Sequence, residues 1–215
     1  LHLLSRRQRQ MCIRDRPGTQ LVFLYLYYAE NTGSVNLTQI AKALSLSKAT
    51  CTRAINDLSA SGLISQTAEG TNKWITTAYT KSELLEKAYG RLKTPVDRIL
   101  YVKGTAQIEH PIASGIRALA RQSMIGVNDQ DGAIAISKKE AAKIPAEDIC
   151  TKQYFEDFGG AVIEVWSYDP IILERDGCVD DISLLLSMDN DPNERVQTCL
   201  DEIRQKHGLP IKEEE

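Results

Sequence analysis

Apolar residues recur at helical spacing in three neighbouring segments near the start of the chain. The run TQLVFLYLYYAE at 19–30 is apolar and aromatic, and it predicts a helix with Thr19 as its cap. Asn36 is placed to cap a second helix, LTQIAKAL, and Ser47 to cap a third. In the third segment, apolar residues at i, i+3, i+4 and i+7 form a predicted buried face: Cys51, Ala54, Ile55 and Leu58.

The pattern changes after the third predicted helix. Gly62 ends that helix, and ISQTAEGTNKWITT at 64–77 predicts two short strands around a turn at 69–72. The order is therefore helix, helix, short turn, helix, hairpin. This order is typical of a winged helix-turn-helix.

A second block follows, in which helical and strand patterns alternate. KSELLEKAYGRL predicts a helix at 81–92, and RILYV, GAIAI and GAVIEVW predict strands. Pro111 is predicted to start a helix whose apolar face holds Ile112, Ile116, Leu119 and Ala120. In the last helix, Asp191 is the predicted cap and Pro192 the first residue, and Glu194, three residues after Asp191, completes a capping box. The expected fold class is α+β, a winged helix-turn-helix followed by a small mixed α/β domain.

Composition places few limits on this picture. The chain has 215 residues, a net charge of −3 and 42% hydrophobic residues, which is typical of a globular protein. It has no apolar run of about 18 residues, so we expect no membrane partner. The cysteines and the three histidines are scattered without the spacing of a zinc site or a disulfide framework. We therefore expect a cytoplasmic protein.

The first sixteen residues differ from the rest of the chain. They carry five arginines against the single acidic residue Asp15, and their MCIRDR string resembles a translated sequencing adapter. We expect 1–16 to be a non-native, disordered segment, and a basic arm for DNA is the alternative. The remaining predicted divisions are a winged helix-turn-helix domain at 17–80, an α/β regulatory or dimerisation domain at 81–209 and an acidic tail at 210–215.

The outer side of the third predicted helix is short, polar and locally basic. An α-helix fits the major groove of DNA, where Arg53 suits guanine and Asn56 suits adenine. The predicted DNA contacts comprise base-facing residues, phosphate contacts at helix starts and two positions near the hairpin tip: Thr38, Gln39, Ser47, Lys48, Thr50, Thr52, Arg53, Asn56, Asn72 and Lys73. The alternative is an ordinary capped helix with a polar surface.

The run LTQIAKALSLSKATCTRAINDLSASGLI resembles the helix-turn-helix of MarR-type bacterial regulators, and the resemblance extends over 19–77. It implies that Lys48, Thr50, Thr52 and Arg53 are DNA-reading positions. MarR-type wings usually carry arginines at the tip, whereas TAEGTNKW offers only Lys73.

Charge in the predicted head is low. Four basic residues and three acidic residues lie between 17 and 80, which gives +1. Phosphate neutralisation drives non-specific affinity, so one such head should bind DNA weakly. Two heads would bind two half-sites together, and we therefore predict a homodimer on double-stranded DNA.

The second block resembles the C-terminal part of AbiEi-type antitoxins through SGIRALARQSMI, GAIAIS and VDDISLLLSM. This resemblance implies a repressor of its own operon that counteracts a toxin. We accordingly expect a sequence-specific transcriptional regulator, with an antitoxin-type interaction protein as the alternative. A toxin or a small-molecule ligand would bind the C-terminal domain.

The sequence signals for catalytic and metal sites are weak, so we predict that the chain is not an enzyme and binds no cofactor and no metal. DNDPNER begins like a calcium loop, but Glu194 replaces the required glycine and Leu200 replaces the bidentate glutamate. Glu164 with Asp180 and Asp181 suggests a metal-dependent nuclease, although Trp166 stands where such sites carry lysine. A nuclease with a DNA-targeting head is therefore a rival hypothesis.

Overall fold

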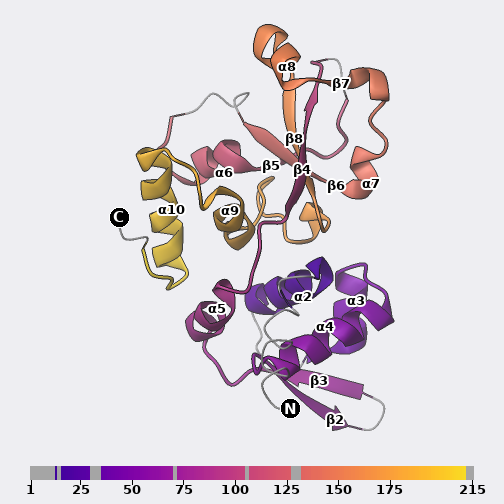
Figure 1. Cartoon of the computed structure of the whole chain (residues 1–215). Coiled ribbons are helices and arrows are strands. Elements are labelled where there is room, and N and C mark those ends of the chain that lie inside the picture. The colour runs from indigo at the N-terminus through magenta and orange to yellow at the C-terminus, as the bar shows by residue number, and fades with distance from the viewer. Residues whose placement is uncertain are drawn as a thin grey trace, which may run out of the picture. The chain divides into compact units, whose positions relative to one another are not determined.

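The computed structural model describes residues 13, 16–29, 35–69, 72–104, 107–126 and 132–211, with backbone alone at 68–69 and 72–73. The chain divides into two compact units (Figure 1). The first runs up to Lys93 and takes in His207–Pro210, and the second comprises Thr94–Lys206 and the residues from Ile211 onward. The first unit extends past residue 80, and the domain boundary expected at that residue stays a prediction.

The first unit contains the predicted winged helix-turn-helix. Its helices are α2 (Pro17–Tyr28), α3 (Leu37–Ala43), α4 (Lys48–Ala60) and α5 (Lys81–Tyr89). Its antiparallel sheet has the order β1 (Val35–Asn36), β3 (Asn72–Thr76), β2 (Ser65–Glu69). The hairpin pairs Glu69 with Asn72, as the sequence predicts.

Helix α2 begins earlier than predicted. It starts at Pro17 and its N-cap is Arg16, which makes no side-chain capping bond. The fixed φ of proline suits the first helical position. Thr19 therefore lies inside the helix, 2% exposed, and the prediction that it caps the helix is wrong. Its hydroxyl instead donates to Asp57 Oδ2 at 3.4 Å.

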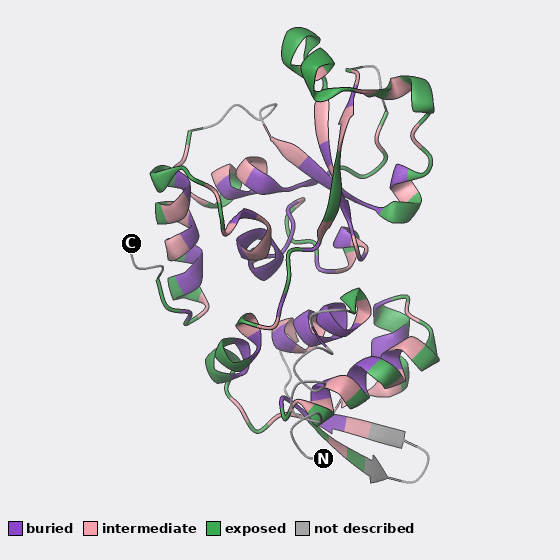
Figure 2. Cartoon of the chain, viewed as in Figure 1, coloured by how far each residue is buried: buried purple, intermediate pink, exposed green. Residues whose placement is uncertain are grey.

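Apolar side chains from α2, α3 and α4 form the core of the first unit. Most of α2 is buried, as Figure 2 shows, and its Phe23 is fully buried. Ile40 and Leu44 from the second predicted helix are buried as well. Helix α2 packs against α4, and α3 packs against α4, so α4 is held from two sides.

Two described residues of the segment 1–16 pack on this unit. Ile13 is 2% exposed, and Arg16 Nη1 lies 2.8 Å from Asp57 Oδ2. The non-native origin of the segment stays a prediction. At the other end of the chain, Leu209 is buried, whereas 212–215, in the predicted acidic tail, lie outside the described residues.

The second unit is built on a five-stranded mixed sheet. The strand order is β5 (Ile112–Ala113), β6 (Ala133–Ser137), β8 (Ala161–Trp166), β4 (Val96–Val102), β7 (Ile149–Cys150). Strands β6 and β8 are parallel, and the other neighbours are antiparallel. Among the described residues, five α-helices accompany the sheet: α6 (Gly115–Gln122), α7 (Lys138–Ala141), α8 (Lys152–Phe158), α9 (Asp181–Met188) and α10 (Glu194–Lys206). The α+β fold class is thus confirmed.

The two faces of the second sheet have different partners. Ile134, Ile163 and Val165 belong to one buried apolar cluster with Ala141 of α7. On the other face, the start of α6 lies close to Glu164, because a Cβ on Gly115 would be 3.6 Å from Glu164 Oε1. The sheet therefore has an aliphatic core on one face and a half-buried carboxylate on the other.

The helix predicted from Pro111 begins four residues later. Ile112 and Ala113 form strand β5 and pair with Ala135 and Ile134 of β6. The Ser114 amide then donates to the Ala133 carbonyl at 3.0 Å, so helical bonding starts only at Gly115. The predicted apolar face is partly wrong as a result, since the buried helical residues are Gly115, Ala118 and Leu119.

The cap of the last helix is also displaced. Asn193 Oδ1 accepts from the Arg195 amide at 3.0 Å, and α10 begins at Glu194. Asp191 Oδ1 instead accepts from the Asn193 amide at 2.9 Å, in the turn before the helix. The prediction of Asp191 as the cap and Pro192 as the first helical residue is therefore wrong. Among the described residues, no helix is both long enough and apolar enough to cross a membrane.

Candidate nucleic-acid interface

A tight turn sets the angle between α3 and α4. The Leu46 amide donates to the Ala41 carbonyl at 3.0 Å and the Ser45 amide to the Lys42 carbonyl at 3.3 Å, the paired bonds of a Schellman motif. Ser45 has a φ of +52° in this motif, where glycine is the usual residue. These bonds fix the helix-turn-helix geometry at the residues SLS.

Ser47 caps α4 as predicted. Its Oγ accepts from the Thr50 amide at 3.1 Å and lies 2.9 Å from the Thr50 hydroxyl. The capped end is exposed at Ser47, Lys48 and Ala49. The start of α4 therefore presents backbone amides and one lysine to solvent, a combination that suits a phosphate.

The inner face of α4 is the predicted one. Each of its four apolar residues is at most 1% exposed: Cys51, Ala54, Ile55 and Leu58. Burial raises the pKa of the Cys51 thiol, so Cys51 is a neutral core residue at neutral pH.

The outer face of α4 presents Arg53 and Asn56, which are both exposed. Arg53 Nε donates a long hydrogen bond of 3.4 Å to the Ala49 carbonyl, and this bond holds the Arg53 side chain along the helix. Its two terminal nitrogens can still donate side by side to a pair of acceptors. Arg53 and Asn56 are three residues apart and so lie on one side of the helix.

The two threonines lie on opposite flanks of this face. Thr52 is half-buried, and its hydroxyl donates to the Lys48 carbonyl at 2.8 Å, so its oxygen can only accept further bonds. Thr50 is half-buried beside α2, because a Cβ on Gly18 would lie 3.1 Å from its methyl. Of the two, Thr50 is turned toward the neighbouring helix.

Helix α3 begins with a capping box beside this face. The Thr38 amide donates to Asn36 Oδ1 at 2.8 Å, and the Asn36 amide donates to Gln39 Oε1 at 3.2 Å. Thr38 and Gln39 are exposed, and the Gln39 amide nitrogen is not used by the cap. The side chains of Asn72 and Lys73 lie outside the described residues.

Sequence reasoning missed two residues that contact α4. Gln66 of β2 donates from Nε2 to Asn56 Oδ1 at 3.3 Å, and Arg16 pairs with Asp57. Strand alternation with the Gly62 turn could have placed Gln66 near the helix. Arg16 gives no such signal because it lies in the segment 1–16, which is expected to be non-native.

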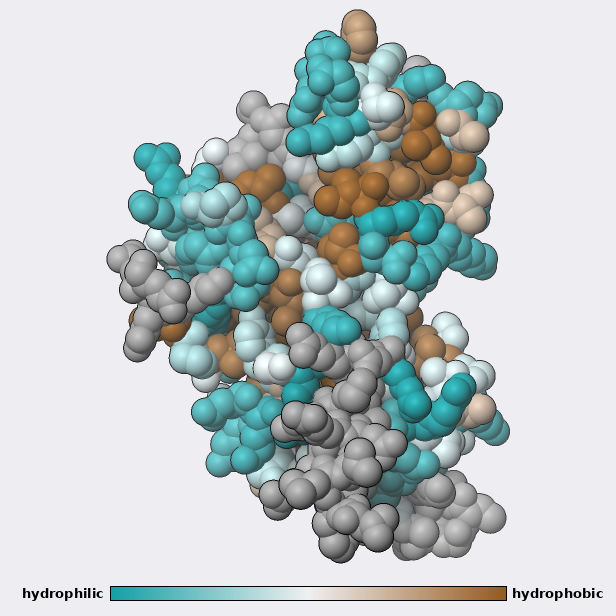
Figure 3. Space-filling view, in the orientation of Figure 1, coloured by the Kyte–Doolittle hydropathy of each residue, from teal (hydrophilic) through white to brown (hydrophobic). Residues whose placement is uncertain are grey.

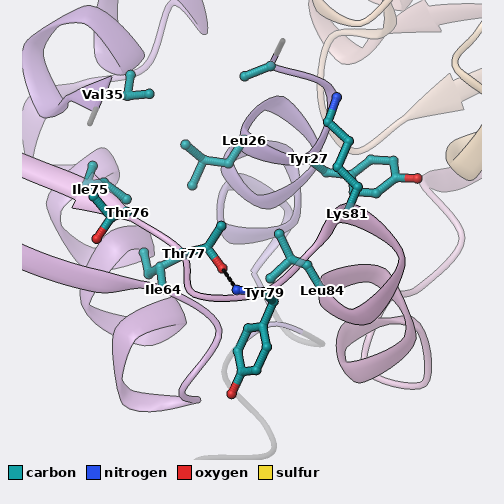
Figure 4. A pocket seen from close by; sticks show the side chains of 11 residues that line it. Leu26, Tyr27, Val35, Ile64, Ile75, Thr76, Thr77, Tyr79, Lys81 and Leu84 are labelled. Carbon is teal, nitrogen blue, oxygen red and sulfur yellow. Dashed lines mark hydrogen bonds between the residues drawn. The ribbon is translucent and has the colours of Figure 1, made fainter. Parts of the chain in front are cut away.

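A small apolar cavity lies elsewhere in the first unit, and Figure 4 shows the side chains that line it. They come from α2, the sheet and α5, and include Leu26, Ile75 and Leu84. The Thr77 hydroxyl accepts from the Tyr79 amide at 3.3 Å there. The lining includes no residue of α4, so this cavity is separate from the candidate interface.

The carboxylates proposed for a nuclease have other partners. Glu164 Oε2 accepts from Trp166 Nε1 at 3.0 Å, Asp180 caps α9 through the Ser183 amide at 3.0 Å, and Asp181 pairs with Lys206 at 2.8 Å. Burial raises the pKa of Glu164, and the Trp166 bond offsets part of that effect. Within the described part of the chain, no three His, Cys, Asp or Glu residues are grouped to hold a metal.

The arrangement of a helix-turn-helix followed by a hairpin, with one helix face exposed, agrees with a comparison of the sequence with protein-family models. Residues 19–73 match the model of the MarR family. The match spans about a quarter of the chain and contains most of α2, all of α3 and α4, and most of the hairpin. It supports a MarR-like winged-helix head. No curated protein and no solved structure matches the chain, and the antitoxin-like second block stays a prediction.

Proposed function

We propose that this chain is a sequence-specific DNA-binding transcriptional regulator that reads DNA with α4. The observation that carries the proposal is the division of α4 into a fully buried apolar side and an exposed side with Arg53 and Asn56. A helix of this width fits the major groove, where side chains reach base edges. The MarR-like match over 19–73 supports the same role.

Each polar residue has a role that follows from its chemistry. Arg53 donates to guanine O6 and N7, and Asn56 pairs with adenine N6 and N7. Thr52 accepts from a base amino group, because its own hydrogen is already donated to the helix. The phosphate contacts of the proposal come from six exposed or hairpin-tip positions and one half-buried flank residue: Thr38, Gln39, Ser47, Lys48, Asn72, Lys73 and Thr50.

The active form in this proposal is a homodimer that represses transcription by occupying an operator. The head is nearly neutral, so one head gains little from phosphate neutralisation. Two heads joined in a dimer read two half-sites about one helical turn apart and bind by avidity. The second unit holds the dimer contacts or an effector, and the mechanism needs no catalysis.

A titration of the full chain on a duplex from its own upstream region tests the proposal. Arg53→Ala removes one bidentate base contact from each head of the dimer, each costing about 1–3 kcal/mol, so binding should weaken at least tenfold. The matched control is Arg98→Ala, an exposed arginine on β4 of the second unit, which should leave binding unchanged. Equal affinity of Arg53→Ala and the wild type would exclude α4 as the reading helix.

A second candidate function is an antitoxin-type interaction protein. Helix α8 has no buried residue and carries Phe158, 74% exposed, and Tyr154, 38% exposed. Apolar side chains are visible on the surface of the second unit in Figure 3. Exposed aromatic residues are enriched at protein interfaces.

This candidate predicts a tight complex with the product of a neighbouring gene. Phe158→Ser should weaken that complex, whereas Met124→Ser, at a fully exposed apolar residue outside α8, should not. Co-purification of the two proteins measures this. A chain that forms no complex and binds its own promoter would exclude the antitoxin role.

A further inference from the structure

One contact joins the hairpin to the outer face of α4. Gln66 Nε2 donates to Asn56 Oδ1 at 3.3 Å, across ten residues of sequence. Both residues sit on regular backbone, since Asn56 lies within α4 and Gln66 pairs with Ile75 in the hairpin register. Asn56 is exposed and Gln66 is half-buried, so the bond lies at the edge of the candidate interface.

The orientation of an asparagine amide decides which base it reads. Adenine offers a donor at N6 and an acceptor at N7, so asparagine must place its oxygen and its nitrogen in one defined order. Rotation of the amide by half a turn exchanges the two atoms and reverses that order. An exposed asparagine without a protein partner adopts both orientations and discriminates bases less well.

The Gln66 donor favours one of the two orientations. It bonds to Oδ1 and would face a second NH₂ group if the Asn56 amide alone were reversed, so the reversed orientation requires the Gln66 amide to turn as well. A carbonyl oxygen has two lone pairs, so Oδ1 still has one for adenine N6 while Nδ2 donates to N7. The contact thus leaves Asn56 able to make its bidentate pair.

We propose that Gln66 is a positioning residue that fixes the Asn56 amide and so sets the base preference at one position of the operator. The proposal rests on the proposed function and deepens it, because it gives the hairpin a part in sequence discrimination. A hydrogen bond between partly exposed side chains contributes little to stability. Its effect therefore falls on base preference and not on folding.

The experiment measures binding of the full chain to an operator duplex and to single-base variants of it. Asn56→Ala first identifies the base pair that Asn56 reads, as the position whose preference disappears. Gln66→Leu should reduce the preference at that same position about threefold to tenfold while leaving the salt dependence of binding unchanged. Thr67→Val is the control, because Thr67 is exposed on the same strand and points to the other face.

Two further variants separate positioning from loss of structure. Gln66→Lys keeps a donor and should retain the preference. Gln66→Glu has nearly the same shape but only accepts, so Asn56 should turn its nitrogen toward the carboxylate and the preference for adenine should be lost. Thermal unfolding of each variant verifies that the chain remains folded.

The outcomes distinguish this proposal from the proposed function. If the wild-type chain binds no duplex, both fail. If Asn56→Ala alters no base preference, or if Gln66→Leu and Gln66→Glu keep the preference that Asn56→Ala loses, the positioning role is overturned while DNA binding stands.

Discussion

Two residues with positive φ end the helices of the helix-turn-helix, and only one of them is glycine. Ser45 follows α3 with a φ of +52°, and Gly62 follows α4 with a φ of +75°. In both turns the amide of the following residue reaches back to close the helix: Leu46 to Ala41 and Leu63 to Leu58. In this left-handed conformation a Cβ crowds the following carbonyl oxygen, so the backbone is strained at Ser45 but not at Gly62, which has no Cβ.

Substitutions at these turns should change stability in opposite directions. Ser45→Gly relieves the left-handed strain and should stabilise the chain by about 0.5–1 kcal/mol, whereas Gly62→Ala should destabilise it by about 1–2 kcal/mol. Apart from its chain neighbours, no atom of the described residues lies within 4 Å of a Cβ at Gly62, so that cost is conformational. Urea unfolding measures both.

Gly90→Ala is the control for this pair, because Gly90 ends α5 with a φ of −64° and also has open space. It should be neutral or slightly stabilising. A Gly62→Ala variant as stable as Gly90→Ala would show that the left-handed conformation is not retained in solution.

Glu164 provides a residue-scale prediction on pH. Its pKa in the folded chain is raised by burial, so the folded state holds its proton more tightly than the unfolded state. The stability that this proton contributes is complete below the ordinary carboxyl value of 4.5 and is lost as pH rises through the folded pKa.

Glu164→Gln keeps an acceptor for Trp166 but does not titrate. It should raise the thermal unfolding temperature at neutral pH relative to the wild type, and the difference should shrink as pH falls toward 4.5. Glu156→Gln, at an exposed position on α8, is the control. A difference between Glu164→Gln and the wild type that does not vary with pH would contradict this account.

At the scale of elements, the sequence predicts the helices of the first unit well because local signals agree there. Asn36 and Ser47 are strong caps, Gly62 suits a left-handed turn, and the apolar spacing from Cys51 to Leu58 is that of a half-buried helix. These signals sufficed to place the outer face of α4. They did not indicate Gln66, whose contact depends on how the hairpin packs.

The wrong predictions arise where tertiary pairing or a competing residue overrides a local signal. Pro111 favours a helix start, but the next two residues gain more from pairing with β6. Strands β1, β5 and β7 are two residues long, too short to show an alternating period. Asn193, two positions after Asp191, caps the last helix in its place. Helix α2 starts at Pro17 and so begins before the predicted cap Thr19.

At the scale of the whole molecule, helix α2 of the first unit is held by residues far from it in sequence. Gln20, 4% exposed, donates to the Lys93 carbonyl at 2.8 Å and accepts from the Lys93 amide at 2.9 Å. Tyr27 and His207 share a hydrogen bond of 2.7 Å. Both contacts lie on α2, seven residues apart and therefore on one side of the helix.

A fragment ending at residue 80 would lose both partners of α2. Within the full chain, Gln20→Leu should destabilise by about 1–3 kcal/mol, because the two hydrogen bonds between the buried Gln20 side chain and the Lys93 backbone are lost. Tyr27→Phe should cost about 1 kcal/mol through loss of the bond to His207. Tyr25→Phe is the matched control on the same helix, and equal unfolding midpoints for all three variants would contradict these roles.

The measurement that most directly tests the central claim is the rate of lysine acetylation in the full chain with and without an operator duplex. Lys48 is exposed at the start of α4, and Lys139 is exposed on α7 of the second unit. If α4 enters the major groove, saturating duplex slows acetylation of Lys48 severalfold and leaves Lys139 unchanged. Bound duplex that leaves the Lys48 rate unaltered would contradict the assignment of α4 as the DNA-reading helix.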